Sequence, residues 1–222
     1  MIDNTLVHLA LRSRLLTLSV ATTGSATLGV TGVGSIFTRT AGSFLTDGFA
    51  TGMELVSTGF AAANNVTATV LSVSALALTV NVALVDDAPA AARTLAVGVP
   101  ALFALTNIDF DMVTGRPYIS EDFVSGPAAQ VTLGPLGAVE TFPLYTVNLF
   151  GVANTGLQAL TRMADAILTL FAPRTDIVLS TGDVVRIRSS PAPYAGPLTQ
   201  ASPGWAFVPV TIPCWIRSSN VI

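Results

Sequence analysis

Four carboxylates near the middle of the sequence are the residues whose types and spacing could do chemistry. Asp109 and Asp111 lie on one face of an extended segment, and Glu121 and Asp122 follow closely. Such a group could bind a hard cation or act as an acid–base pair. The loop glycine and the terminal glutamate of a calcium site are missing, so solvated charges at a sheet edge are the favoured interpretation. A carboxylate-based ligand-binding or hydrolytic domain remains the weaker alternative.

Other catalytic arrangements find little support in the residues present. The chain contains ten arginines and no lysine, which excludes a Walker-type phosphate loop, a Schiff-base lysine and a lysine base. Gly29, Gly32 and Gly34 lack the strand-to-helix context of a phosphate loop. His8 and Cys214 are the only residues of their types, so no histidine-based metal site, Cys–His pair or internal disulfide is expected. We therefore predict a protein that is not an enzyme and has no catalytic, metal-binding or cofactor-binding residues.

The composition indicates a surface that something else covers. Only 10% of the 222 residues are charged, against roughly 25% in an ordinary soluble domain. The mean hydropathy is +0.67, which fits either a membrane protein or a chain covered by copies of itself or by partners. The net charge of −3 provides no basic surface for nucleic acid.

A membrane span is the less favoured of these two interpretations. The uncharged run from Leu55 to Val85 is long enough to cross a bilayer, but Thr, Ser and Asn interrupt it at short intervals and favour strands. Asp3 precedes the apolar part of the N-terminus and Arg12 and Arg14 follow it, which is not the order of a signal peptide. We therefore expect synthesis in the cytosol and no membrane partner.

The first helix is predicted at residues 2–16, with Asp3 or Asn4 as its cap. Its expected apolar stripe consists of Ile2, Leu6, Leu9 and Leu16. His8 lies away from this stripe, so we expect it to be a partly exposed surface residue.

A second, strongly amphipathic helix follows a strand at residues 139–150. Its apolar positions recur at steps of three and four and are Leu157, Leu160, Ala164, Ile167, Leu168 and Phe171. Asn154 or Thr155 can cap its start, and Pro173 ends it. One dry face predicts that this helix lies across a sheet.

The last strand, residues 205–216, alternates between two faces. Its even-numbered residues are apolar and predict a core face, on which Cys214 is a small buried hydrophobe. Pro209 and Pro213 remove hydrogen-bond donors on one lateral side, which predicts an edge or bulged strand. The other face carries three large aromatic residues, Trp205, Phe207 and Trp215. We expect either the rest of the chain or a neighbouring subunit to cover them.

Arg186 and Arg188 alternate with Val185 and Ile187, so both guanidinium groups project from one strand face. They could meet nucleic acid, pair across a subunit contact or remain solvated. The nearly uncharged, proline-rich segment 189–204 is typical of a loop that is disordered or ordered by a partner.

The chain is expected to have an α+β fold in two parts. Residues 18–99 are rich in Gly, Thr, Ser, Ala and Val, and predict an inserted all-β domain of seven strands between Leu15 and Val97. A turn is expected at residues 86–89. Residues 1–17 and 100–222 then form a discontinuous body, in which two helices pack on an antiparallel or mixed sheet.

The body resembles the tail terminator proteins of long-tailed, siphovirus-like bacteriophages. The resemblance covers the N-terminal helix and about residues 95–217, and rests on the order of the elements and on the phrases RPYI, QVTLGP and VPVTIPCW. The inserted stretch IFTRTAGSFLTDGFATGMELVSTGFAAANN is similar to small β modules of phage head-to-tail and tail proteins, and departs from the plainest members of the family.

The resemblance implies a structural virion protein of the tail or neck, assembled in the host cytoplasm. It would form a homo-oligomeric ring, expected to be a hexamer, that caps the tail tube, stops its polymerisation and joins the tail to the head–tail connector or stopper protein. DNA would pass through the lumen in transit. Five residues are predicted to lie in subunit or tube contacts: Arg186, Arg188, Trp205, Phe207 and Trp215. Another neck, connector or baseplate ring protein is the alternative.

Overall fold

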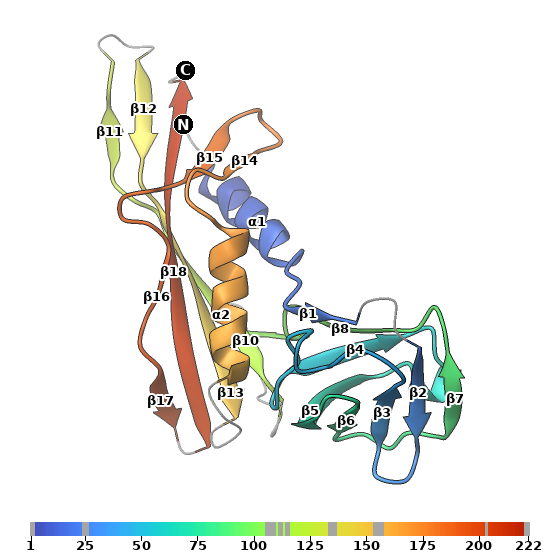
Figure 1. The fold of residues 1–222 in the computed structure, drawn as a ribbon. Coiled ribbons are helices and arrows are strands. Elements are labelled where there is room, and N and C mark those ends of the chain that lie inside the picture. Colours follow the sequence, from blue (N-terminus) through green and yellow to red (C-terminus); the bar gives the residue numbers. More distant parts are fainter. Residues whose placement is uncertain are drawn as a thin grey trace.

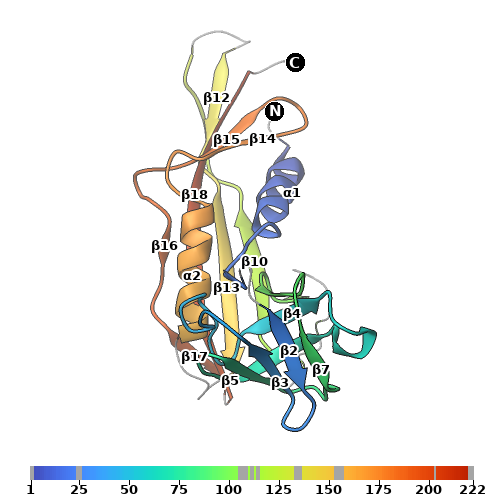
Figure 2. The same cartoon turned by 45° about the vertical axis from the view of Figure 1, so that its right-hand side comes forward.

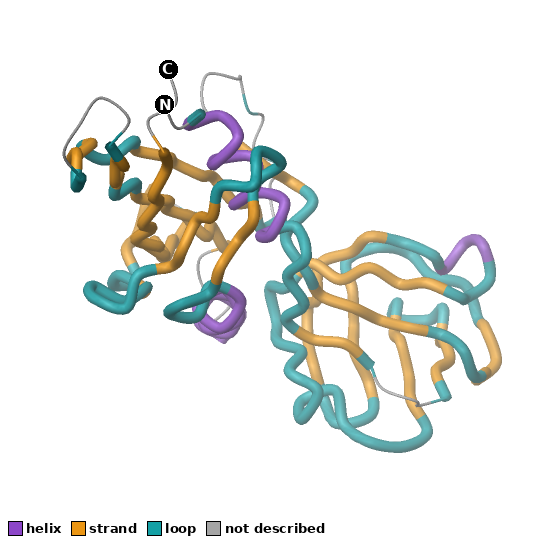
Figure 3. The backbone as a smooth tube through the Cα atoms, turned by 90° about the horizontal axis from the view of Figure 1, so that it is seen from above, coloured by secondary structure: helices purple, strands orange, loops and turns teal. Residues whose placement is uncertain are grey.

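The chain folds into two sheets and two α-helices. The computed structural model describes residues 3–23, 27–104, 110, 113, 116–132, 137–152, 158–202 and 204–219. Within these residues, an eight-stranded and a ten-stranded sheet lie side by side (Figure 3). Most strand pairs are antiparallel and one is parallel, which confirms the predicted α+β fold with an antiparallel or mixed sheet.

The eight-stranded sheet uses residues 21–97. Its strands are β1 (Ala21–Thr22), β2 (Leu28–Thr31), β3 (Ile36–Arg39), β4 (Glu54–Thr58), β5 (Thr67–Val73), β6 (Ala77–Val80), β7 (Asp87–Ala90) and β8 (Thr94–Val97). They are arranged in the order β1-β8-β4-β5-β6-β3-β2-β7 and enclose a core of their own (Figure 1). That residues 18–99 form a separate inserted domain stays a prediction.

Two expectations for this sheet were wrong. The first strand was expected to start at Leu15, but that residue is the last of a helix and β1 begins at Ala21. The turn expected at residues 86–89 is instead the start of β7. This strand lies at one end of the sheet order, where Pro89 can be accommodated because an edge strand has one side free of ladder bonds.

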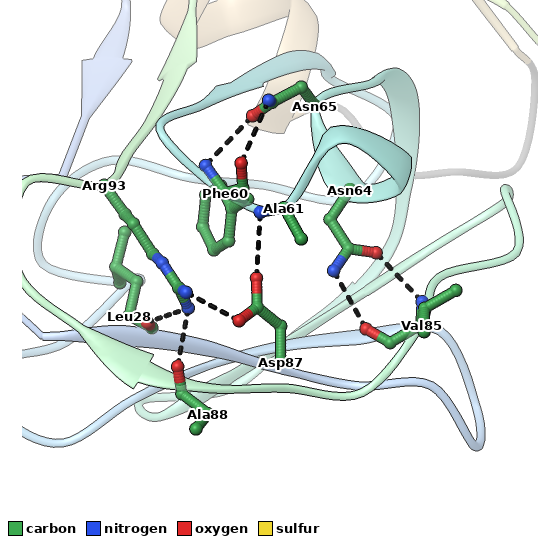
Figure 4. A network of polar contacts seen from close by, with 9 residues as sticks. All are labelled: Leu28, Phe60, Ala61, Asn64, Asn65, Val85, Asp87, Ala88 and Arg93. Atoms are coloured by element: carbon green, nitrogen blue, oxygen red, sulfur yellow. Dashed lines mark hydrogen bonds and ion pairs between the residues drawn. The ribbon is translucent and has the colours of Figure 1, made fainter.

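A network of polar contacts fixes the loops of the smaller sheet (Figure 4). Asp87 accepts from the Ala61 amide at 3.0 Å and from Arg93 Nη2 at 2.6 Å. These bonds favour the carboxylate and lower the pKa of Asp87. Asn64, in the 3₁₀ helix η1 (Ala62–Asn64), is fully buried, and its side chain bonds both the amide and the carbonyl of Val85. The loops around η1 are therefore held by buried side chains.

The ten-stranded sheet uses residues 102–219. Its strands are β9 (Leu102–Ala104), β10 (Tyr118–Val124), β11 (Ala128–Gln130), β12 (Ala138–Thr141), β13 (Leu144–Val152), β14 (Asp176–Val178), β15 (Val184–Ile187), β16 (Tyr194–Ala195), β17 (Thr199–Ser202) and β18 (Trp205–Ser219). One path runs β11-β12-β18-β13-β10-β9, and β15, β16 and β17 pair with the other side of β18. The strand expected at residues 139–150 is divided between β12 and β13, which keep one register along β18.

An edge or bulged strand was expected here; β18 lies in the middle of the sheet and is not an edge strand, but its pairing with β17 contains a register shift. Its two prolines nevertheless act on one side only. Their carbonyls accept from that side, Pro209 from the Gly196 amide at 2.7 Å and Pro213 from the Arg188 amide at 2.9 Å. The side that lacks donors is filled by three short strands in place of one regular ladder. The segment 189–204 supplies two of them, β16 and β17, and is thus ordered largely by its own chain.

Two helices cover one face of this sheet, as Figures 1 and 2 show from two directions. The first, α1 (Asn4–Leu15), is capped as expected by Asp3, whose carboxylate accepts from the Thr5 and Leu6 amides. Its buried stripe is Val7, Leu11 and Leu15, while Leu9 and Leu16 of the expected stripe are exposed. Both stripes are apolar in sequence. The buried stripe is the one whose neighbouring polar residues face the sheet when the helix packs.

The second helix, α2 (Gln158–Leu170), confirms the predicted amphipathic pattern. Its buried residues include Leu160, Ala164 and Ile167, whereas Asp165 and Thr169 are exposed. The buried residues of α2 pack on the even-numbered residues of β18, including fully buried Cys214. The expected caps Asn154 and Thr155 lie outside the described residues.

A buried carboxylate links the two sheets. Glu54, on β4, is 5% exposed and accepts from the Ala101 amide at 2.6 Å, where the chain leaves the smaller sheet. The same carboxylate accepts from Arg116, two residues before β10, at 2.9 Å from Nε and 2.6 Å from Nη2. Charge-assisted bonds of this kind fix Ala101 and the residues just before β10 relative to the smaller sheet.

Candidate assembly interface

The sheet face opposite the two helices is the candidate interface, and we call it the outer face. In β18 the even-numbered side chains enter the core, so the odd-numbered ones lie on the outer face. Register places Arg186 opposite Trp215 on this face. No described helix covers it, which leaves arginines and aromatic side chains only partly buried.

An arginine cluster surrounds Trp215 at one end of β18. It consists of Arg174, Arg186, Arg188 and Arg217, which line two cavities together with Trp215. The Arg186 guanidinium lies 5.5 Å from the centre of the Trp215 ring, and that of Arg188 lies 5.2 Å from the Phe142 ring. The aromatic faces thereby hold two of the cations in fixed orientations.

One ion pair fixes Arg186 further. Its Nε and Nη2 donate to the two oxygens of Asp176 on β14, at 2.6 and 2.7 Å. This two-point contact lowers the pKa of Asp176 and raises the pKa of Arg186. Both side chains are nearly half exposed, so the pair positions the guanidinium more than it stabilises the fold.

Two cavities flank Trp215. The first, of about 270 Å³, is lined by three of the arginines, by Phe142 and by Ser189 and Ser190. The second, of about 450 Å³, is lined by Arg186, Arg217 and Asp183 among others. A lining of arginine and aromatic side chains suits an anionic group that is attached to an apolar surface.

An aromatic cluster occupies the other end of the outer face. Tyr118, Phe150 and Phe207 face one another across β10, β13 and β18, with ring centres 4.4 and 5.4 Å apart. Trp205 meets Tyr118 edge-on at 5.1 Å. Burial raises the pKa of Tyr118, so its hydroxyl stays protonated at neutral pH. This row of aromatic rings forms an apolar surface on the outer face.

The structure divides the five residues that the sequence singled out. Arg186, Arg188 and Trp215 belong to the arginine cluster, whereas Trp205 and Phe207 belong to the aromatic cluster. Trp205 and Trp215 are ten residues apart on one strand, which corresponds to roughly 33 Å. The interface hypothesis therefore concerns two separate surfaces on one face.

Sequence reasoning missed several members of these clusters. Phe150 could have been found from the alternation of its strand, which puts it on the same face as Asn148. Arg174 and Phe142 had no such signal. Arg174 lies in a turn with φ of 68°, and Phe142 occupies the break between β12 and β13, so only the folded chain brings them to Trp215.

The structure describes two of the four carboxylates, and these two do not form one site. Asp109 and Asp111 lie outside the described residues. Glu121 and Asp122 are neighbours on β10 and therefore point to opposite faces. Glu121 is 1% exposed, so the expectation of a solvated charge was wrong for this residue, whereas Asp122 is exposed as expected. No cluster of metal-ligating side chains occurs in the part of the chain that the structure describes.

Glu121 is the centre of a buried polar group beneath α1. Arg12 Nε and Nη2 both donate to its Oε1, and the Tyr145 hydroxyl donates to its Oε2 at 2.7 Å. His8 Nε2 lies 3.0 Å from Oε1 without the alignment of a hydrogen bond, and its ring stacks on Phe123. Burial and the charge of Arg12 lower the pKa of His8. His8 is partly exposed, as expected, and the polar group attaches α1 to the sheet.

One comparison with known proteins identifies the family of this chain. No helix among the described residues is long and apolar enough to cross a membrane. No curated protein and no solved structure matched the chain. The family model described as phage tail terminator protein matches residues 79–214, which is well over half of the chain and includes nearly the whole larger sheet. The chain therefore belongs to the phage tail terminator protein family, a family of structural phage proteins.

Proposed function

We propose that this chain forms a ring of six copies at the end of the tail tube. The ring stops polymerisation of the tube and joins the finished tail to the connector or stopper protein of the head. The observation that carries the proposal is the family match over residues 79–214. Membership of this family implies contact with the tail tube. The closed ring and the attachment to the head go beyond family membership and are proposed here.

The outer face supports an assembly role. It presents arginine, tryptophan, phenylalanine and tyrosine, which are the residue types enriched at the centres of protein interfaces. We assign Arg186, Arg188 and Trp215 to one contact and Trp205 and Phe207 to another. Their separation along β18 suits a subunit that meets two different neighbours, such as a second copy and the tube.

The charge of the chain supports a conduit for DNA. With ten arginines against thirteen acidic residues, the protein has a net charge of −3. Each phosphate held by a cation would retard a passing duplex, so weak attraction favours transit through the lumen.

Deletion of the gene from the phage tests this function. Without the protein, electron micrographs of lysates should show overlong tubes or tails that are not joined to heads. Tails of normal length that lack only a baseplate, or heads that lack only a connector, would instead indicate another ring protein of the virion.

Complementation with variants tests the assigned residues. Trp205→Ala and Trp215→Ala proteins should restore joined tails poorly, because truncating a central interface residue typically costs about 2 kcal/mol or more. Leu16→Ala, which truncates a 59% exposed apolar side chain directly after α1, is the control and should complement fully. Full complementation by both tryptophan variants would remove these residues from the interface.

A further inference from the structure

The arginine cluster carries more positive charge than its surroundings balance. Arg186 has Asp176 as its partner, but no carboxylate of the described residues forms an ion pair with Arg174, Arg188 or Arg217. Arg174 and Arg188 line the same cavity as Arg186. Three guanidinium groups around one cavity repel one another, so an anionic group from another molecule would be stabilised there.

The neighbours of the cluster favour a protein carboxylate over a nucleic-acid phosphate. Asp176 and Asp183 lie within the cluster, and Glu140 is opposite Arg217 on the adjacent strand. With four arginines against these three carboxylates, the surface keeps a net charge of +1, which suits a single carboxylate better than a backbone with one phosphate per nucleotide. Val178 on β14 is 68% exposed at the border of the same surface, which adds an apolar area that a protein could cover.

The opposite edge of the same sheet carries the complementary features. Asp122 on β10 is exposed on the outer face and accepts from Asn148 Nδ2 at 3.0 Å. It forms no ion pair with any described residue. Val124, two residues further and on the same face, is 59% exposed. Strand β9 pairs only with residues 118–120 of β10, so this part of the edge is open among the described residues.

We propose that the arginine cluster of one copy receives Asp122 of the next copy, with Val178 and Val124 covered in the same contact. The inference rests on the proposed ring. Complementary surfaces at opposite edges of one subunit are what a head-to-tail contact requires, because each copy then uses one edge toward each neighbour and the ring closes.

Charge exchange tests this pairing. Arg188→Glu and Asp122→Arg should each weaken ring formation by about 10- to 100-fold, since like charges then meet at every contact. Ring formation is followed by mass photometry of the purified protein over a concentration series. A chain that carries both substitutions should form rings again, because every contact then joins a glutamate to an arginine.

A mixture of the two single variants gives a sharper readout. The glutamate of one variant meets the arginine of the other, and the next contact is the wild-type pair, so alternating rings form with an even number of subunits. Arg174→Glu, at an exposed position, replaces Arg188→Glu if loss of the Phe142 contact prevents folding. Asp165→Arg on the exposed side of α2 makes the same charge change as Asp122→Arg and should leave the ring intact.

The outcomes separate this inference from the proposed function. If the wild-type protein forms rings and the single variants form them equally well, or if neither the double variant nor the mixture restores them, the pairing is refuted while the ring stands. If the wild-type protein neither forms rings in solution nor ends tail tubes, the proposed function fails as well.

Discussion

Removal of the Glu121 carboxylate should destabilise the fold strongly, because three donors depend on it. Arg12 directs two N–H groups to Oε1, and the Tyr145 hydroxyl donates to Oε2 at 2.7 Å. Glu121 and Tyr145 are almost completely inaccessible to solvent, and the Arg12 side chain is 27% exposed. Burial raises the pKa of Tyr145, so its hydroxyl stays a donor across the accessible pH range.

The magnitude follows from the groups that Glu121→Ala leaves behind. An unsatisfied buried hydroxyl at Tyr145 costs about 1 to 3 kcal/mol, and the same applies to the guanidinium of Arg12, less what its exposed part regains from water. The sum is about 3 kcal/mol, near the lower end of values for broken buried pairs. Glu121→Gln keeps one acceptor oxygen and should cost less, about 2 kcal/mol.

Urea denaturation at neutral pH measures this loss. The series is repeated at several protein concentrations, because association would add a concentration-dependent term to the free energy of unfolding. Asp165→Asn, at an exposed position on α2, is the control and should change that free energy by less than about 0.5 kcal/mol. A loss below about 1 kcal/mol for Glu121→Ala would refute the argument that this buried group attaches α1 to the sheet.

Three further predictions concern other buried groups. Because the pKa of folded His8 lies below the unfolded value of 6.5, the unfolded chain binds the proton more readily. The free energy of unfolding should therefore be unaffected by His8 above about pH 6.5 and should fall as the pH is lowered through the folded pKa; an equal fall in His8→Gln would contradict this. Burial raises the pKa of Cys214 to about 12, so a thiol reagent should label it at neutral pH only after unfolding, and rapid labelling of the native protein would show that the core face of β18 is accessible. Glu54→Gln should lower stability by about 1 to 2 kcal/mol and speed hydrogen exchange at the Ala101 amide, and unchanged exchange would argue against a link between the two sheets.

The alternation of β18 shows what local sequence can predict. From Ala206 to Ile216 its even-numbered residues are all apolar, so the core face, including Cys214, follows directly from the period of two. Its place in the middle of the sheet does not follow, because two prolines normally indicate an edge. Only the structure shows that three short strands pair with the side of β18 on which the prolines lack N–H donors.

The first helix shows where local patterns are ambiguous. Both the expected stripe and the observed one, Val7, Leu11 and Leu15, are apolar, so hydrophobicity alone could not select between them. The selection comes from Glu121, more than a hundred residues away, which draws Arg12 toward the sheet. The arginine cluster is similar, since Arg174 and Phe142 reach Trp215 from distant turns and breaks. The faces of the side chains on β18 were thus predictable, and the positions of side chains supplied by irregular segments were not.

Electron cryomicroscopy of the junction between tail and head in purified virions tests the central claim most directly. The account predicts one closed ring of this chain on the last ring of the tail tube, with the outer faces of its subunits in contact with neighbouring protein. Virions in which this chain is absent from the junction, or is present there as isolated copies that do not close a ring, would contradict it.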